Sequence, residues 1–307
     1  MNHFISLKYF SASQIQDLID LAIRIKVAPL DSKSSLAAKS VGLIFEKSSL
    51  RTKTAFYLGA LQLGAYAVYY SPDEIKLGQR ESISDVARTL SGYLDAVVLR
   101  TYSHSSILEF AHASSVPVIN GLSDFLHPSQ ALADVMTIKE LKGDIKKLKV
   151  VYIGDGNNVC NSLIYAFSLL GGKLTLAIPP DYLPSVEILN EAKDYAKISG
   201  STMEIVPSVE EAVVGADVLY TDVWISMGNE DQQTERKKAF KNYQINGKIL
   251  QLAKQDAIVM HCLPAHRGEE ITDSVIESEN SVVFTQAQNR LHTAKAILSY
   301  ILKEWAK

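Results

Sequence analysis

The sequence predicts an α/β protein with two doubly wound domains, each built around a parallel sheet. Three observations predict this fold class. The chain has 307 residues, which suits two domains of ordinary size. Short runs of β-branched and apolar residues alternate with longer helix-like segments almost throughout, as expected for βαβ units. These runs are nearly continuous in hydrophobicity, which is typical of strands buried on both faces of a parallel sheet.

Strands are expected in both halves of the chain. In the first half the runs are residues 41–45, 66–70, 95–100 and 117–120. In the second half they are residues 149–154, 173–179, 202–206, 217–222, 257–262 and 281–286.

Helices are expected between these strands and at both ends of the chain. The first helix begins near the N-terminus, with Ser11 or Ser13 as its N-cap. The polar stretch 142–147 marks the expected boundary between the domains. The last segment, residues 287–307, is expected to form a long amphipathic helix that the pattern alone assigns to neither domain.

Composition and charge exclude several classes of partner. The formal net charge of -3 gives no general attraction for nucleic acid or an anionic membrane. No run approaches the ~18 apolar residues of a membrane helix, and the N-terminal segment lacks the apolar core of a targeting signal. Cys160 and Cys262 cannot make a disulfide framework and suit a reducing cytosol. We therefore expect a cytoplasmic protein in which any anion site comes from locally clustered arginine and lysine.

Polar side chains of unusual chemistry follow several predicted strands. In an open α/β sheet, ligands bind outside the carboxyl ends of the strands. The residues at or after those ends are 46–53, Arg100, 124–130, 155–158, 222–228 and 261–267. Their collection at one edge of both sheets predicts an active site between the two domains.

The segment after the first strand has the chemistry of an anion site. Ser48 or Ser49 can cap a helix that runs to about Gly64, so that free amides face the strand edge. Arg51 adds a fork that grips phosphate in bidentate fashion. An ordinary capped helix start is the alternative interpretation. Arg100 supports the anion site, because a charge at the end of an apolar strand needs a partner.

Other chemistries are weaker. Gly154-Asp155-Gly156 begins like a dinucleotide fingerprint, but Val159 stands where the third glycine belongs, so a tight turn is favoured. His261, Cys262 and His266 lack a fourth partner at standard zinc spacing. Cys262 is open to three interpretations: a nucleophile, a binding thiol or a plain buried cysteine.

Four motifs together resemble the aspartate/ornithine carbamoyltransferase family, and they cover nearly the whole chain. Residues 45–53, Phe-Glu-Lys-Ser-Ser-Leu-Arg-Thr-Lys, resemble its carbamoyl-phosphate signature. Residues 127–130, His-Pro-Ser-Gln, are similar to its His-Pro-x-Gln. Residues 222–228 look like the Asp-x-x-x-Ser-Met-Gly of its ornithine branch, and residues 261–264 like the His-Cys-Leu-Pro of that branch.

The resemblance implies transfer of the carbamoyl group of carbamoyl phosphate to the δ-amine of L-ornithine, giving L-citrulline and phosphate in arginine metabolism. Both arginine biosynthesis and, in reverse, arginine breakdown use this reaction, and the sequence does not choose between them. It implies no metal and no cofactor. It also implies that the C-terminal helix packs back on the first domain. The carbamoyl-phosphate domain would then comprise residues 1–143 with 287–307, and the ornithine domain residues 144–286. A homotrimer, or a multiple of trimers, with sites at subunit interfaces is implied as well.

The resemblance also assigns the site residues. Phosphate would be held by Ser49, Leu50, Arg51 and Thr52, with Lys76 reaching it from a neighbouring subunit. The carbamoyl end would be held by Arg100, His127, Gln130, Cys262, the Leu263 backbone and Arg290. The amino-acid head of ornithine would be held by Asn158, Asp222, Ser226 and the Met227 backbone. Catalytic roles fall to Arg100 and His127, which polarise the carbonyl, and to Asp222 and Cys262, which orient the amine.

The chain departs from the family pattern at three places, and three other functions are the alternatives to ornithine carbamoylation. Leu50 replaces a threonine, Lys53 an arginine, and Lys76 the glutamine common in ornithine enzymes. The nearest rival is a sister transferase acting on putrescine, N-acetylornithine or aspartate. A non-catalytic metabolite-binding protein and a dinucleotide-dependent oxidoreductase are the rivals from other classes.

Overall fold

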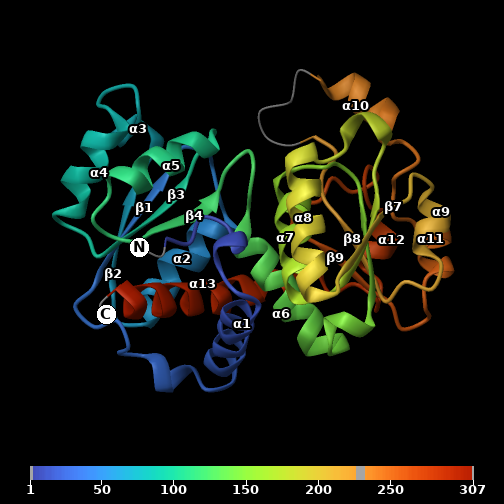
Figure 1. Ribbon diagram of the computed structural model, residues 1–307, viewed down its shortest axis with the longest axis horizontal. Coiled ribbons are helices and arrows are strands. Elements are labelled where there is room, and N and C mark those ends of the chain that lie inside the picture. The colour runs from blue at the N-terminus through green and yellow to red at the C-terminus, as the bar shows by residue number, and fades with distance from the viewer. Residues whose placement is uncertain (1–2, 226–231, 306–307) are drawn as a thin grey trace. The chain divides into compact units, whose positions relative to one another are not determined.

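The computed structural model describes residues 3–225 and 232–305, which form two compact units (Figure 1). The first unit comprises residues 1–136 and 288–307, and the second residues 137–287. Two helices cross between them. Helix α6 (Pro128–Lys142) leads from the first unit into the second, and α13 (Val283–Trp305) leads back. The expected boundary, after residue 143, lies just beyond the end of α6.

The first unit is a four-stranded parallel sheet in the order β2-β1-β3-β4. Its strands are β1 (Ser40–Phe45), β2 (Tyr66–Tyr70), β3 (Ala96–Arg100) and β4 (Val118–Leu122). Its helices are α1 (Ala12–Val27), α2 (Arg51–Gln62), α3 (Pro72–Ile75), α4 (Ile83–Ser91) and α5 (His104–Ala113), with short 3-10 turns at Leu7–Tyr9 and Pro29–Ser32. Helices α4 and α5 pack on one face of the sheet, while α2 and α13 lie on the other (Figure 1).

The second unit is a five-stranded parallel sheet in the order β7-β6-β5-β8-β9. Its strands are β5 (Lys149–Ile153), β6 (Lys173–Ala177), β7 (Thr202–Ile205), β8 (Val218–Thr221) and β9 (Ile258–His261). Its helices are α7 (Asn158–Leu170), α8 (Val186–Ser199), α9 (Val209–Val213), α10 (Gln233–Phe240), α11 (Gly247–Leu252) and α12 (Asp273–Ile276), with 3-10 turns at Ile145–Lys147 and Pro180–Tyr182. Helices therefore cover both faces of each sheet, and the predicted fold class is confirmed (Figure 1).

Each sheet reverses its direction of growth once. In the first unit the chain moves from β1 to β2 on one side and then places β3 on the other side of β1. In the second unit it moves from β5 through β6 to β7 and then places β8 on the other side of β5. A crevice opens at the carboxyl ends of the two strands where such a reversal occurs, which is where ligands bind in this architecture. The topology thus singles out the ends of β1 and β3, and of β5 and β8.

The expected N-terminal cap is confirmed at Ser11. Its hydroxyl accepts the backbone N–H of Gln14 at 3.2 Å, and the Gln14 side chain accepts the Ser11 N–H at 2.9 Å. This reciprocal capping box satisfies two backbone donors at the start of α1.

The expected strand at 281–286 is wrong. Only Ser281 forms an isolated bridge, to Val259 of β9, and α13 begins at Val283. The Val282 N–H still donates to the Val259 carbonyl at 2.9 Å, but farther along β9 the His261 N–H is bound by the side chain of Gln286 at 2.9 Å. A helical residue thus replaces a strand partner. A short apolar run at a buried helix start cannot be distinguished from a strand by hydrophobicity alone.

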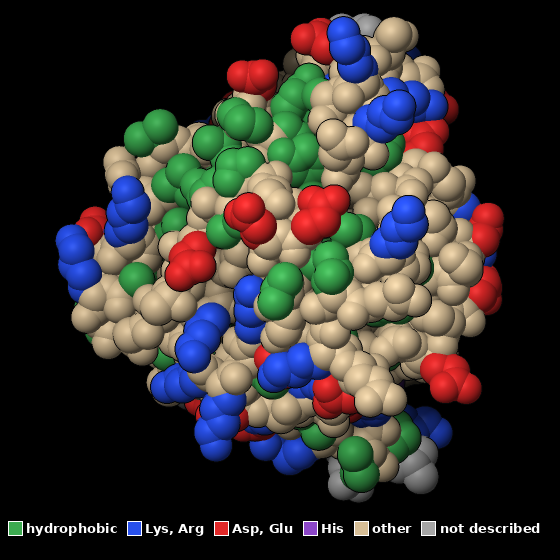
Figure 2. Space-filling view, turned by 90° about the vertical axis from the view of Figure 1, so that its right-hand side faces the viewer, with side chains coloured by type: hydrophobic (Ala, Val, Ile, Leu, Met, Phe, Trp, Pro, Cys, Tyr) green, Lys and Arg blue, Asp and Glu red, His purple; other side chains and the backbone are tan. Residues whose placement is uncertain are grey.

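One face of the molecule carries charges of both signs. On the face shown in Figure 2, Lys and Arg side chains occur together with Asp and Glu, and hydrophobic side chains gather in its upper part. Among the described helices, none is both long and apolar enough to cross a membrane.

Candidate functional site

The reversal point of the first sheet gathers positive charge. Arg100 is the last residue of β3 and lies opposite Phe45 of β1 in the register. Arg51 is the first residue of α2, and Arg290 comes from α13. His127 immediately precedes α6 and is 5% exposed, while Arg100 and Arg290 are 6% and 4% exposed. The predicted carbamoyl-phosphate side chains of this unit therefore come from several segments of the chain.

Arg290 organises this group through its guanidinium. One nitrogen donates to the Thr52 hydroxyl at 2.8 Å, and another donates to the Gln130 side-chain carbonyl. The Gln130 amide in turn donates to Asp134 at 2.8 Å. Thr52, Gln130 and Asp134 are all buried. A planar fork that reaches two acceptors at once is what arginine offers and lysine does not.

Burial and like charge shift the pKa values of this group. The pKa of Arg100 is lowered to about 10 by burial and by the nearby charges of Arg290 and Arg51. Burial, followed by the charges of Arg290, Arg100 and Arg51, holds the pKa of His127 well below its usual range. His127 is therefore neutral at physiological pH. Among the described residues the Arg100 Nε has no hydrogen-bond partner. Such mutual repulsion is relieved when an anion binds.

The start of α2 differs from the sequence prediction. The N-cap position is Leu50 rather than Ser48 or Ser49, and leucine has no oxygen with which to cap the helix. The Ser49 hydroxyl instead accepts the Lys53 N–H at 3.4 Å, one residue into the helix from the usual capping contact. Leu50 is 75% exposed, and the Lys53 ammonium lies 3.3 Å from the centre of the Tyr69 ring.

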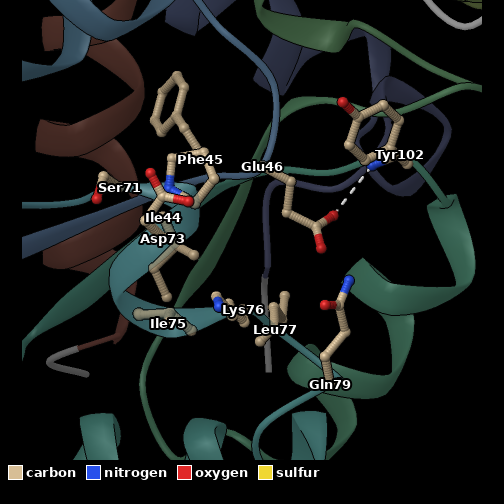
Figure 3. Close-up of a pocket in the computed structure, with 11 residues that line it drawn as sticks. Ile44, Phe45, Glu46, Ser71, Asp73, Ile75, Lys76, Leu77, Gln79 and Tyr102 are labelled. Atoms are coloured by element: carbon tan, nitrogen blue, oxygen red, sulfur yellow. Dashed lines mark hydrogen bonds between the residues drawn. The ribbon is translucent and has the colours of Figure 1, made fainter.

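Lys76 lies in a separate pocket of the first unit, shown in Figure 3. The pocket has a volume of about 240 Å³ and is lined by Glu46 after β1, by the α3 segment and by Tyr102. The Glu46 carboxylate accepts the Tyr102 N–H at 3.1 Å, and burial raises the pKa of this carboxyl (Figure 3). Lys76 itself has φ 47° at the end of α3. Its contribution to a neighbouring subunit stays a prediction.

The reversal point of the second sheet has the opposite chemistry. Asp222 follows β8 directly and is 6% exposed. One carboxylate oxygen accepts the Asn157 amide at 2.7 Å. The other accepts the Cys262 thiol at 2.8 Å and the Val223 N–H at 2.8 Å. The loops after β5, β8 and β9 therefore meet at one carboxylate.

The loop after β5 contains a site residue to which the sequence analysis gave no role. Asn157 contacts Asp222, and it also caps α7 by accepting the Val159 and Cys160 N–H groups at 3.0 and 3.1 Å. The signal was an asparagine at a helix start. Asn158 is the first residue of α7 and is half-buried. Gly156 has a packing reason, because a Cβ there would lie 2.5 Å from the Tyr182 carbonyl and the Pro184 nitrogen.

A buried ion pair supports the same loops. Arg236 of α10 pairs with Asp155 and donates its Nε to the Trp224 carbonyl at 2.7 Å. Its guanidinium lies over the Tyr182 ring at 4.7 Å. Burial raises the pKa of Asp155 to about 6, although Arg236 opposes the rise. The sequence analysis missed Arg236 because an arginine in a polar helix is usually solvated.

The loop after β9 is held by a fully buried histidine. The Leu263 N–H donates to His261 Nδ1 at 2.8 Å, so the ring proton lies on Nε2, 2.9 Å from the Glu270 carboxylate. Leu263 adopts φ 58°, which is uncommon for a residue with a branched side chain. Glu270 was also missed, because nothing in its local sequence links it to His261.

Two groups of side chains bring metal-ligand atoms within 4.8 Å of one another: Asp222, His261 and Cys262, and His266, Glu269 and Glu270. In the first group both His261 nitrogens are engaged by Leu263 and Glu270, and the other two side chains bond each other. This arrangement does not fit a metal site. The two remaining predicted ornithine residues, Ser226 and Met227, lie outside the described residues.

Comparisons with known proteins agree along the whole chain. A family model described as "Aspartate/ornithine carbamoyltransferase, carbamoyl-P binding domain" matches residues 2–140, and its "Asp/Orn binding domain" counterpart matches residues 146–301. An ornithine carbamoyltransferase of Methanoculleus marisnigri is 47% identical over 96% of this chain and 95% of its own. A catabolic ornithine carbamoyltransferase of Thermoplasma acidophilum is 49% identical over 94% of each chain. The solved structure of the Pyrococcus furiosus ornithine carbamoyltransferase matches with a TM-score of 0.95 at 44% identity, covering 98% of this chain and 97% of its own.

Proposed function

The chain belongs to the aspartate/ornithine carbamoyltransferase family and is a carbamoyltransferase; we propose that it transfers the carbamoyl group of carbamoyl phosphate to the δ-amine of L-ornithine. The products are L-citrulline and phosphate. The observation that carries the proposal is the group of the buried Arg100 and Arg290 and the half-buried Arg51 around a neutral His127. It has the charge to bind a phosphate dianion and the donors to polarise a carbonyl beside it.

In the first unit, the proposed phosphate ligands are Ser49, the Leu50 amide, Arg51 and Thr52, and the proposed carbamoyl ligands are Arg100, His127, Gln130 and Arg290. Attack on the carbamoyl carbon places negative charge on its oxygen. Arg100 and His127 stabilise that charge as preorganised donors, by the logic of an oxyanion hole. Because His127 is neutral, it stabilises the oxygen by donating a hydrogen bond, without carrying a charge of its own.

In the second unit, the proposed ligands are Asn158, Asp222, Ser226 and Met227 for ornithine, with Cys262 and the Leu263 backbone beside the carbamoyl group. The nucleophile is a neutral amine, whose free pKa resembles that of lysine, about 10.4. Asp222 and Cys262 orient this amine. The nitrogen–carbon bond forms, the bond from carbon to the bridging oxygen breaks, and the amine proton passes to the departing phosphate. Holding both reactants in contact supplies much of the rate.

The biological setting rests on the resemblance and on the relatives. We propose a cytoplasmic homotrimer without cofactor or metal, in which Lys76 serves the site of a neighbouring subunit. The reaction belongs to arginine metabolism, where it can serve arginine biosynthesis or, in reverse, arginine breakdown. Putrescine, N-acetylornithine and aspartate are the alternative acceptors.

The test is an acceptor panel. The purified protein is incubated with carbamoyl phosphate and, separately, with ornithine, putrescine, N-acetylornithine or aspartate, and the ureido product is measured. Citrulline from ornithine alone is the expected result. Product from another amine would overturn the acceptor but keep the carbamoyl-phosphate site, and no product from any would refute the reaction.

A further inference from the structure

The side-chain amide of Gln130 is held in one orientation by two neighbours of opposite kind. Arg290 faces its oxygen, and Asp134 lies 2.8 Å from its nitrogen. Gln130 and Asp134 are four residues apart on α6, so both lie on one helix face. They are 1% and 0% exposed, so both side chains lie away from the solvent.

The chemistry of the neighbours permits no other orientation. A guanidinium has only donors and cannot face an amide nitrogen. The Asp134 oxygen already accepts from the Gln130 nitrogen, so a reversed amide would set oxygen against oxygen there. Reversing the Gln130 amide would create two repulsive contacts in a buried place. The oxygen of Gln130 therefore points to the side of Arg290 and Thr52, and the nitrogen points to Asp134.

This orientation decides what a ligand meets beside Arg290. An amide oxygen has two lone pairs, and Arg290 uses one of them. Among the described residues, no second donor to the Gln130 oxygen is present. A ligand bound in the arginine group can satisfy the second lone pair only by presenting a hydrogen-bond donor, which in a carbamoyl group is the N–H. A methyl group in the same place would leave a buried acceptor unpaired.

We propose that Asp134 is a positioning residue that makes this subsite select a carbamoyl NH₂ over a methyl group of the same size. The inference rests on the proposed function and adds a specificity element to it. Asp134 acts through Gln130, and the group that it selects is the one that distinguishes carbamoyl phosphate from acetyl phosphate.

A stable pair of phosphonates isolates this selection. Phosphonoacetamide ends in CONH₂ and 2-oxopropylphosphonate ends in COCH₃, and a methylene in place of the bridging oxygen prevents hydrolysis of both. Inorganic phosphate reports the phosphate contacts alone. The dissociation constants of the three probes are measured by calorimetry on the full-length protein and on its Asp134→Leu and Asp134→Asn variants. Glu140→Leu, which removes a carboxylate from the same helix, is the matched control.

The wild type is expected to prefer phosphonoacetamide by about tenfold, as one well-placed buried hydrogen bond allows. Asp134→Leu should reduce this preference to about twofold or less, with little change for phosphate. Asp134→Asn, which still offers an oxygen to the Gln130 nitrogen, should retain most of it, and Glu140→Leu all of it. If Asp134→Leu does not fold, Asp134→Ser carries the same test, because its hydroxyl is too short to reach Gln130.

Two results would overturn the inference. Equal losses for all three probes would show that Asp134 only supports the fold, and an unchanged preference in Asp134→Leu would show that Gln130 needs no second anchor. Either outcome leaves the proposed function intact. The proposed function itself fails if the wild type binds phosphonoacetamide no better than phosphate and makes no citrulline.

Discussion

The two reversal points stand at equivalent places in two sheets of the same type but carry opposite chemistry. The first gathers guanidinium groups and a neutral histidine at the ends of β1 and β3. The second gathers a carboxylate, a thiol and side-chain amides at the ends of β5, β8 and β9. The fold therefore decides where a ligand binds, and the side chains decide its charge.

Burial shifts the pKa of a charged side chain in both regions, but the neighbouring charges differ. In the first, like charges face one another, and the pKa of Arg100 falls to about 10. In the second, the buried Asp155 has Arg236 as a partner, and its pKa is still raised to about 6. In the first region the positive charges repel one another, and a bound anion would reduce this repulsion. In the second region the buried carboxylate of Asp155 already forms an ion pair with Arg236.

The largest expected effect is the loss of the first region's organiser. Arg290→Met removes the donors to Thr52 and Gln130 together with a positive charge. Charge-assisted bonds contribute about 1.5–3 kcal/mol each, so carbamoyl-phosphate affinity should fall at least about 100-fold. Calorimetry measures the change, and the exposed Arg88→Met controls for net charge. An affinity within a few-fold of wild type would mean that the arginine group is structural.

The second region should respond to the other substrate. Asp222→Asn keeps the shape of the side chain but removes the charge that Asn157 and Cys262 contact. Ornithine affinity should fall by about 10–100-fold, as one charge-assisted contact allows, with carbamoyl phosphate nearly unaffected. Steady-state kinetics, with each substrate varied in turn, measures the two affinities. The variant Asp181→Asn, at an exposed position, is the control. Equal losses for both substrates would remove the distinction between the two regions.

The buried acid of the second region should be visible in pH dependence. The folded-state pKa of Asp155, about 6, exceeds the ordinary value of 3.8, so the folded protein binds a proton more tightly than the unfolded chain does. Its stabilising contribution is therefore present below about pH 4 and is lost as the pH rises through about 6. Compared with Asp155→Asn, the wild type should gain up to about 3 kcal/mol of unfolding free energy between pH 7 and pH 4.

Urea unfolding of both proteins across this range tests the Asp155 prediction. A difference between them that does not vary with pH would show that the carboxylate is stably ionised by Arg236.

The smallest effect is expected at the exposed start of α2. Leu50→Thr restores the residue that the family usually has there, and its side chain is exposed. If the Leu50 contact is made through its backbone amide, carbamoyl-phosphate affinity should change by less than about threefold. Calorimetry measures the carbamoyl-phosphate affinity of Leu50→Thr. The Thr52→Val variant, which removes a buried hydroxyl bound by Arg290, is measured beside it for comparison. A tenfold gain would instead assign the side chain a direct role.

The sequence pattern predicted a structural feature correctly where that feature depends on a single short segment. The capping box at Ser11 depends on Gln14 three residues away, and the buried strands depend on their own apolar runs. The segment 281–286 was mistaken for a strand because Gln286 substitutes for a strand partner only through contact with His261. The helix α2 begins after Leu50, not after Ser48 or Ser49 as expected, and it has no side-chain cap.

By itself the sequence determined the fold class, the family motifs and the polar residues at the strand ends, because these depend on periodicity and on short segments. Only the tertiary structure decided which of those residues touch. It brought Arg290 to Gln130 across 160 positions, Arg236 to Asp155 across 81, and Asn157 to Asp222 across 65. Hydrogen bonds act over about 3 Å and are directional, so partners that are distant in the chain leave no signal in any single segment and are set by packing.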